Sequence, residues 1–285
     1  NADILMEIIN NIMDLSKLEL NVYESNKDYY NIVTLVEDTA VEFNDYVKLN
    51  LDLSHRLPAG KSVIGSFLTH DDSSSMIHGG ENFCKLTTIL QSTIPMCNPY
   101  FIDGFQTGDY YDYKYRDTEN IETYTEKTLM NEHRYRLALF NLSRKPGGDC
   151  PDIERVMKGA LIKMRSENLD VLADRNSSFI ELDKREDKYD QIITYARHNN
   201  GRTILVVANK NPNRNVTGII EIPGLKETQK LENMVPEYGE TSEFQVSENE
   251  LRVNLAPADA YVFEIDTPNL ENDRKEHAFK QKVHD

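Results

Sequence analysis

The stretch from residue 61 to residue 109 restricts the possible folds of this chain more than any other part. It begins with a run rich in Val, Ile, Phe and Leu at 62–68, which does not alternate and therefore predicts a strand buried on both faces. Apolar residues at helical spacing follow at 81–92, and a second apolar segment covers 94–102. A strand, a helix and a strand in this order predict a parallel pair joined by a right-handed crossover.

Polar residues follow the first predicted strand directly, in the order Thr69, His70, Asp71, Asp72 and Ser73. In a β/α barrel, the catalytic groups lie at the carboxyl ends of the strands. One imidazole and two carboxylates at this position therefore indicate an active-site loop. The alternative is a solvated loop in which Asp72 or Ser73 caps the next helix.

Two motifs in this stretch resemble the last two barrel strands of the alpha-amylase family, glycoside hydrolase family 13. Residues 67–71, Phe-Leu-Thr-His-Asp, resemble the family's F-x-x-N-H-D, although Thr69 stands where the family usually has Asn. Residues 93–105 are similar to a phrase of the form G-I-P-x-I-Y-x-G, with 97–99 interpreted as an insertion. The resemblance implies the C-terminal part of a (β/α)8 barrel.

The same resemblance assigns roles to four residues. Asp71 would be the carboxylate that stabilises the oxocarbenium-like transition state, and His70 would bind hydroxyls of the sugar at the point of scission. Tyr100 and Asp103 would be further substrate-binding residues. The implied reaction is retaining cleavage or transfer at an α-glucosidic bond of an α-glucan or oligosaccharide. No cofactor and no metal-ligand set is recognisable, and calcium enters only through the family resemblance.

The nucleophile and the general acid of such an enzyme have no recognisable counterpart in the sequence. In the family the nucleophile is an Asp two residues after an Arg, but Arg56 is the only Arg before His70 and is not part of an R-x-D motif. The roughly 60 residues ahead of the first predicted strand are also too few to supply six further barrel strands. We therefore expect another polypeptide segment to complete the barrel. The alternative is a non-catalytic module that binds carbohydrate or protein.

Residues 1–50 predict a helical hairpin with two apolar stripes. Residues 9–19, INNIMDLSKLE, resemble the end of the dimerisation hairpin of sensor histidine kinases. No His precedes His55, so the phosphoacceptor of such a kinase is absent. A dimerisation module derived from a kinase and a plain amphipathic helix pair both remain open.

The second half of the chain predicts one helix followed by short strands. The helix starts near Asp152, and its Lys158, Lys163 and Arg165 are expected to favour its own C-terminal dipole. Its expected inward residues are Ile153, Val156, Met157, Ala160, Leu161 and Met164. Seven segments of period two, at 179–182, 191–196, 203–208, 217–222, 243–246, 251–255 and 261–265, predict an antiparallel β-sandwich without a titratable cluster.

The predicted fold class is thus α/β plus all-β. We expect a helical hairpin at 1–50, the C-terminal part of a (β/α)8 barrel at 51–170, a sandwich at 171–267 and a charged tail at 268–285.

Composition excludes several classes of function. A net charge of −16 argues against binding to nucleic acid and to an anionic membrane surface. No apolar run approaches the ~20 residues of a membrane span. No basic leader precedes an apolar segment, so a cytoplasmic location is expected, although Asn1 indicates a processed or truncated start. The three cysteines contain no C-x-x-C pair, so neither a disulfide framework nor a zinc site is predicted.

Overall fold

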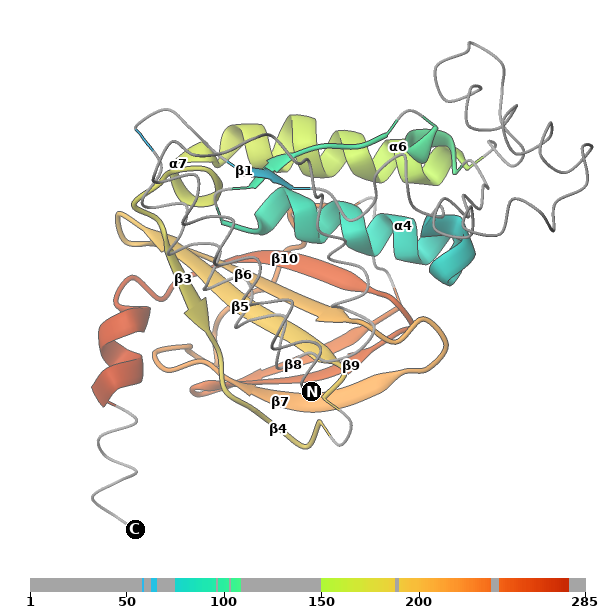
Figure 1. Ribbon diagram of the computed structural model, residues 1–285. Helices are drawn as coiled ribbons and strands as arrows, with labels where there is room; N and C mark the ends of the chain where they lie inside the picture. Colours follow the sequence, from blue (N-terminus) through green and yellow to red (C-terminus); the bar gives the residue numbers. More distant parts are fainter. Residues whose placement is uncertain are drawn as a thin grey trace, which may run out of the picture.

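The computed structural model describes residues 58, 63–65, 75–95, 97–102, 104–108, 150–187, 190–236 and 241–276. The predicted helical hairpin, His70, Asp71 and Asp103 lie outside these ranges. The described part consists of a helical layer above two antiparallel sheets (Figure 1). No described helix is long and apolar enough to cross a membrane.

The predicted strand, helix and strand are present as β1 (Val63–Gly65), α4 (Ser75–Thr93) and β2 (Cys97–Pro99). β1 and β2 pair in parallel, with Val63 opposite Cys97 and Gly65 opposite Pro99. The parallel pair predicted from sequence is confirmed, but both strands are shorter than predicted and the helix starts earlier. Gly79 and Gly80 leave the helical conformation and divide α4 into two pieces. The piece before this kink is the part that was not predicted.

A second helix packs beside α4. It begins as α6 (Pro151–Met157), with Pro at its first position. Asp152 and Glu154 lie in its first turn, where their negative charges interact favourably with the positive end of the helix dipole. It continues as the π-helix η3 (Lys158–Arg165), and α7 (Leu169–Leu172) follows. Of the residues predicted to face inward, Ile153, Val156, Ala160 and Met164 are buried, while Met157 and Leu161 are half-buried.

The strands after α7 form two four-stranded sheets in which all neighbours are antiparallel. One sheet has the order β10-β6-β5-β3 and contains β3 (Ser178–Glu181), β5 (Ile192–Asn199), β6 (Arg202–Asn209) and β10 (Ala260–Ile265). The other has the order β4-β7-β9-β8 and contains β4 (Lys184–Arg185), β7 (Val216–Glu221), β8 (Glu243–Ser247) and β9 (Glu250–Leu255). All seven predicted strands are present. The two-residue β4 was not predicted, because both of its residues are charged.

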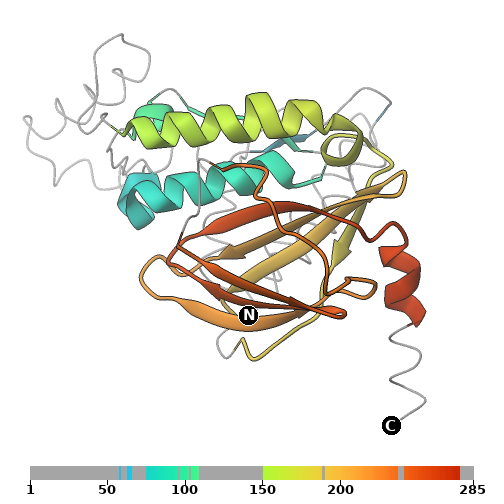
Figure 2. The same cartoon turned by 180° about the vertical axis from the view of Figure 1, so that it is seen from behind.

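Strand β6 lies between the two hydrophobic cores of the described part. Its Ile204 and Val206 belong to the core shared with α4 and η3, whereas Leu205 and Val207 belong to the core between the two sheets. Because both faces are covered, β6 has a continuous apolar run instead of alternation. The view from behind shows the same order of layers, with the helices on one side of this sheet and the second sheet on the other (Figure 2).

Strand β9 lies in the second sheet and covers only one core. Its Leu251, Val253 and Leu255 are buried and Arg252 between them is exposed, so β9 shows the alternation that allowed its prediction.

Candidate functional site

The candidate site is the edge formed by the carboxyl ends of β1 and β2. Parallel strands in register end at the same edge, here at Gly65 and Pro99. His70 and Asp71 follow Gly65 in sequence and lie outside the described residues, as does Asp103. Tyr100 follows Pro99 directly, so it is the predicted site residue that the structure places at this edge.

Tyr100 combines an exposed side chain with a fixed backbone. Its relative exposure is 44%, which makes it one of the few large hydrophobic residues of the described part that face solvent. Its carbonyl oxygen accepts a hydrogen bond of 2.9 Å from Nε2 of Gln91, a buried residue of α4. A phenol ring held in this way can stack on the apolar face of a sugar while its hydroxyl remains available for hydrogen bonding.

The segment after Tyr100 packs against the helical layer. Phe101 and Phe105 lie with their ring centroids 4.9 Å apart, and Phe105 is buried in one cluster with Cys84 of α4 and Ile153 of α6. Phe105 belongs to the short helix η1 (Phe105–Thr107), which starts after Gly104. Gly104 has φ 95°, a backbone conformation that favours glycine. The loop that carries Tyr100 is therefore anchored on both helices.

Arg165 fixes the beginning of β2. Its Nη1 donates to the carbonyl of Ser92 at 2.6 Å and its Nη2 donates to the carbonyl of Cys97 at 2.7 Å. The sequence predicted that Arg165 would favour the C-terminal dipole of its own helix, but its side chain is buried and binds the end of α4 instead. Burial lowers the pKa of the Arg165 guanidinium, yet its hydrogen bonds to carbonyl oxygens compensate part of that desolvation.

A second buried arginine, Arg197 of β5, binds the same end of α4. Its Nη1 donates to the carbonyls of Thr93 at 2.9 Å and Leu172 at 3.1 Å, and burial lowers its pKa to about 10. Tyr195 lies beside it, with its hydroxyl 2.7 Å from Oγ1 of Thr93, and burial raises the pKa of that phenol. Among the described residues, the hydrogen bonds of both arginines go to backbone carbonyls. Three of these carbonyls, those of Ser92, Thr93 and Leu172, lie at the ends of helices, which otherwise leave them unpaired.

No protein-family model and no curated protein matches the chain. Solved structures do. The maltogenic alpha-amylase AmyB from Thermotoga neapolitana matches with a TM-score of 0.54 and 13% identity, over 82% of this chain and 47% of that chain. The gamma-CGTase from the alkalophilic Bacillus clarkii matches with a TM-score of 0.53 and 16% identity, over 82% and 30%. The debranching enzyme from Nostoc punctiforme matches with a TM-score of 0.51 and 16% identity, over 79% and 38%.

This chain shares its fold with the alpha-amylase family. The resemblance predicted from residues 67–71 and 93–105 is confirmed at the level of the fold. The chain spans less than half the length of each of these three enzymes, at 47%, 30% and 38%. The antiparallel sheets and few helices of the described part fit a partial amylase-like fold.

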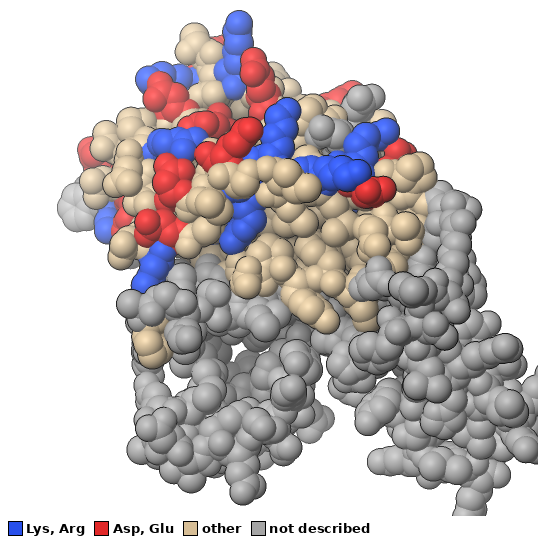
Figure 3. All heavy atoms as spheres, turned by 90° about the horizontal axis from the view of Figure 1, so that it is seen from above, with Lys and Arg blue, Asp and Glu red and all other residues tan. Residues whose placement is uncertain are grey.

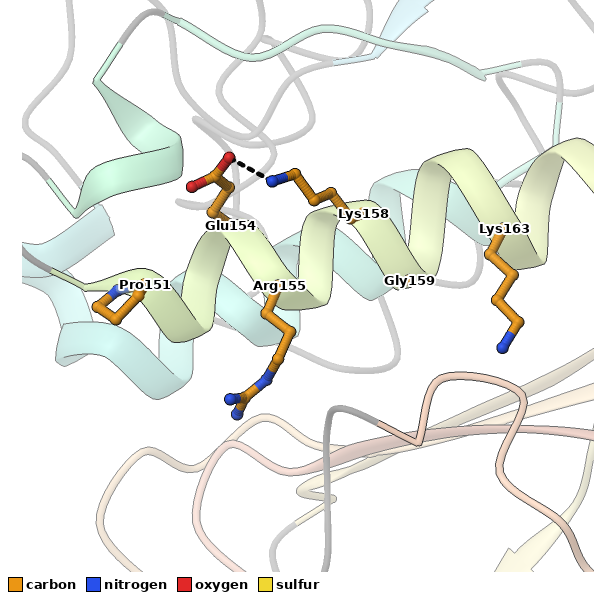
Figure 4. Close-up of a pocket in the computed structure, with 6 residues that line it drawn as sticks. All are labelled: Pro151, Glu154, Arg155, Lys158, Gly159 and Lys163. Carbon is orange, nitrogen blue, oxygen red and sulfur yellow. Dashed lines mark ion pairs between the residues drawn. The ribbon is translucent and has the colours of Figure 1, made fainter.

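The described part of the helical layer carries a hollow on its outer face. A shallow hollow of about 340 Å³ is lined by Pro151, Glu154, Arg155, Lys158, Gly159 and Lys163, all from α6 and η3 (Figure 4). Glu154 pairs with Lys158 at 2.6 Å, and Arg155 pairs with Asp152 at 2.9 Å. Basic and acidic side chains are interspersed over the described part of this face (Figure 3). Glu154 and Lys158 thus neutralise each other within the hollow, and none of its six lining residues comes from the edge of β1 and β2.

The described residues contain no group of three or more His, Cys, Asp or Glu side chains that could hold a metal ion. Calcium therefore stays an expectation taken from the amylase resemblance.

The prediction that the two sheets contain no titratable cluster is wrong, because Asp259 and Tyr261 are hydrogen-bonded to each other. Asp259, which precedes β10, accepts hydrogen bonds through Oδ2 from the hydroxyls of Ser242 and Tyr261. Burial raises the pKa of this carboxyl, and burial also raises the pKa of Tyr261 to about 12. The spacing of Asp259 and Tyr261 by two residues, which puts both on one face of an extended chain, was the available signal. The cluster ties the start of β8 to β10 and is structural.

Proposed function

We propose that this chain is the C-terminal portion of an amylase-like glycoside hydrolase or transglycosylase that acts on α-glucosidic bonds. In this proposal, β1 and β2 are the last two strands of a (β/α)8 barrel, and the two sheets are the β-sandwich that follows it. The observation that carries the proposal is the parallel β1, α4 and β2 unit, with exposed Tyr100 at its carboxyl edge, in a fold shared with alpha-amylase family enzymes.

The proposed roles follow the family motif. Asp71 stabilises the positive charge that develops on the sugar ring in the transition state, and His70 binds the sugar hydroxyls. Tyr100 provides a stacking surface, and Asp103 accepts hydrogen bonds from the substrate. The nucleophile and the acid are supplied from outside this sequence by a segment that completes the barrel.

A single tryptophan can test this proposal, because the chain contains none. In Tyr100→Trp, the indole becomes the only tryptophan and reports on the candidate site through its emission. Titration with maltoheptaose should change that emission in a saturable way. Adding His70→Ala or Asp71→Asn to this variant should weaken the binding.

The matched control is Ile162→Trp, which places the indole on η3 at a residue that is 70% exposed. Its emission should not respond to maltoheptaose. The sugar site is refuted if the emission of the indole at position 100 shows no saturable change, or if the control changes equally. Saturable binding that is unaffected by the changes at His70 and Asp71 would favour the alternative, a non-catalytic carbohydrate-binding module.

A turnover assay tests the second half of the proposal. The purified chain should release no reducing sugar from starch or maltodextrin, because its sequence lacks a recognisable nucleophile and acid. Starch cleavage by the purified chain that is lost in Asp71→Asn would contradict the placement of these groups outside the sequence.

A further inference from the structure

We propose that Arg165 is a positioning residue for the candidate sugar site, holding β2 so that Tyr100 lies at the carboxyl edge. This inference rests on the proposed function for its sugar ligand and on the observed contacts for its mechanism.

Strand β2 has little hydrogen bonding of its own to fix its position. It is three residues long, and among the described strands it pairs with β1 alone, which is equally short. So few backbone hydrogen bonds leave the direction of a strand weakly determined. Contacts outside this pairing must therefore define where Tyr100 lies.

Arg165 supplies such a contact across the turn that leads into β2. Residues 94 and 95 turn the chain at the end of α4, ahead of the first residue of β2. Arg165 bonds a carbonyl on each side of this turn, Ser92 before it and Cys97 after it. A planar guanidinium holds its two terminal nitrogens in a fixed relation, so it fixes the distance between these carbonyls.

Gln91 supplies the matching contact at the other end of β2. Its Nε2 donates to the carbonyl of Tyr100 at 2.9 Å, while Arg165 binds the carbonyl of Cys97. β2 is thus held at its first residue and directly after its last one by side chains from η3 and α4. Neither contact involves the ring of Tyr100, which stays exposed.

Arg197 provides an internal comparison. It is buried like Arg165 and binds the same end of α4, through Thr93, but its other hydrogen bonds go to Leu172 and Ser178. Loss of Arg197 should therefore disturb the end of the helix without releasing β2. This difference separates a positioning role of Arg165 from a merely structural one.

The test uses the Tyr100→Trp chain and adds Arg165→Met, Arg165→Lys, Arg197→Met or Gln91→Leu. Two quantities are measured: quenching of the indole by acrylamide, without sugar, and the dissociation constant for maltoheptaose. Arg165→Met and Gln91→Leu should increase quenching and weaken maltoheptaose binding by about fivefold or more. Arg165→Lys should recover part of the affinity, because an ammonium can still donate to one or both carbonyls.

Arg197→Met should change the affinity for maltoheptaose by less than about twofold, even where it lowers stability more than Arg165→Met does. Equal effects of the two methionine variants on quenching and affinity would overturn the proposal. If the indole does not respond to maltoheptaose even with Arg165 present, the proposed function fails, and acrylamide quenching alone then decides the positioning role. Should Arg165→Met not fold, unchanged quenching in Arg165→Lys and Gln91→Leu would overturn it.

Discussion

Replacing Arg197 by Met tests whether its hydrogen bonds outweigh the cost of burying its charge. Arg197 is completely buried, and Nη1 donates to two carbonyls at 2.9 and 3.1 Å, while Nε reaches the carbonyl of Ser178 at 3.4 Å. Met has a similar unbranched stem and removes both the charge and the donors. The carbonyls of Thr93 and Leu172 then lose these donors.

Two effects of opposite sign determine the result. Hydrogen bonds of a charged group are worth about 1.5–3 kcal/mol each, so loss of the two shorter ones costs about 3–6 kcal/mol. Burial lowers the pKa of Arg197 from 12.5 to about 10, which corresponds to about 3 kcal/mol that the Met variant no longer spends on keeping the charge. The difference is a net loss of about 0–3 kcal/mol in the free energy of unfolding, with a central value of about 1.5 kcal/mol, so the hydrogen bonds should outweigh the cost of burial.

Urea unfolding followed by far-ultraviolet circular dichroism measures this difference. The control is Arg252→Met, at an exposed position of β9 where Arg252 pairs with Glu186, and it should change stability by no more than about 0.5 kcal/mol. If Arg197→Met is as stable as the unchanged chain, or more stable, the reasoning is wrong and the buried charge is a net burden.

Three further substitutions test other parts of the fold by the same unfolding measurement. Burial raises the pKa of Asp259 above 3.8, so the folded state binds the carboxyl proton more tightly than the unfolded state does. The stability that this proton contributes is therefore lost as pH rises from about 4. Asp259→Asn should therefore gain stability relative to the unchanged chain between pH 4 and pH 7, and an equal difference at both pH values would contradict this. Gly108→Ala should cost about 1–2 kcal/mol for its left-handed φ of 69°, plus a clash because the new Cβ would lie 2.9 Å from a cysteine sulfur. A Gly108→Ala chain that is as stable as the unchanged chain would contradict this. Tyr195→Phe keeps the ring and removes the hydrogen bond to Thr93, so it should cost about 1 kcal/mol, and a loss near zero would show that this bond contributes nothing.

The strands of the two sheets were predictable because the pattern of apolar residues within each strand indicates it. In β9, buried Leu251, Val253 and Leu255 alternate with more exposed residues, and this pattern is visible in the sequence without any neighbour. In β6 the unbroken apolar run indicated a strand covered on both faces, which the two hydrophobic cores explain. β4 escaped because its two charged residues carry no such pattern.

The boundaries of the β1, α4 and β2 unit were less predictable. Helical spacing indicated α4 from residue 81, but the helix starts at Ser75. The first piece was missed because the kink at Gly79 and Gly80 interrupts the apolar periodicity. β2 begins at Cys97 and not at Ile94, because Ile94 still donates its N–H to the carbonyl of Leu90 at the end of α4. Such details depend on hydrogen bonds at a helix end, which periodicity does not reveal.

The candidate site was predictable only in part. Motif reasoning selected Tyr100, and the parallel register puts it at the carboxyl edge of β2. His70, Asp71 and Asp103 stay predictions. Arg165 and Arg197 were not recognised as buried, because what stabilises them is carbonyl groups of α4 and β2 that are distant in sequence.

The chain leaves and re-enters the described fold at almost one point. The N–H of Cys150 donates to the carbonyl of Thr107 at 3.1 Å, and Gly108 lies directly against Cys150. Thr107 and Cys150 are thus neighbours in space although they are 43 positions apart in sequence. The length of the chain between them can vary at little cost, since the entropy of closing a longer loop rises only slowly. Natural relatives or engineered versions could exchange the stretch between these two residues for a longer, shorter or unrelated one, and α6 would still start from the same place.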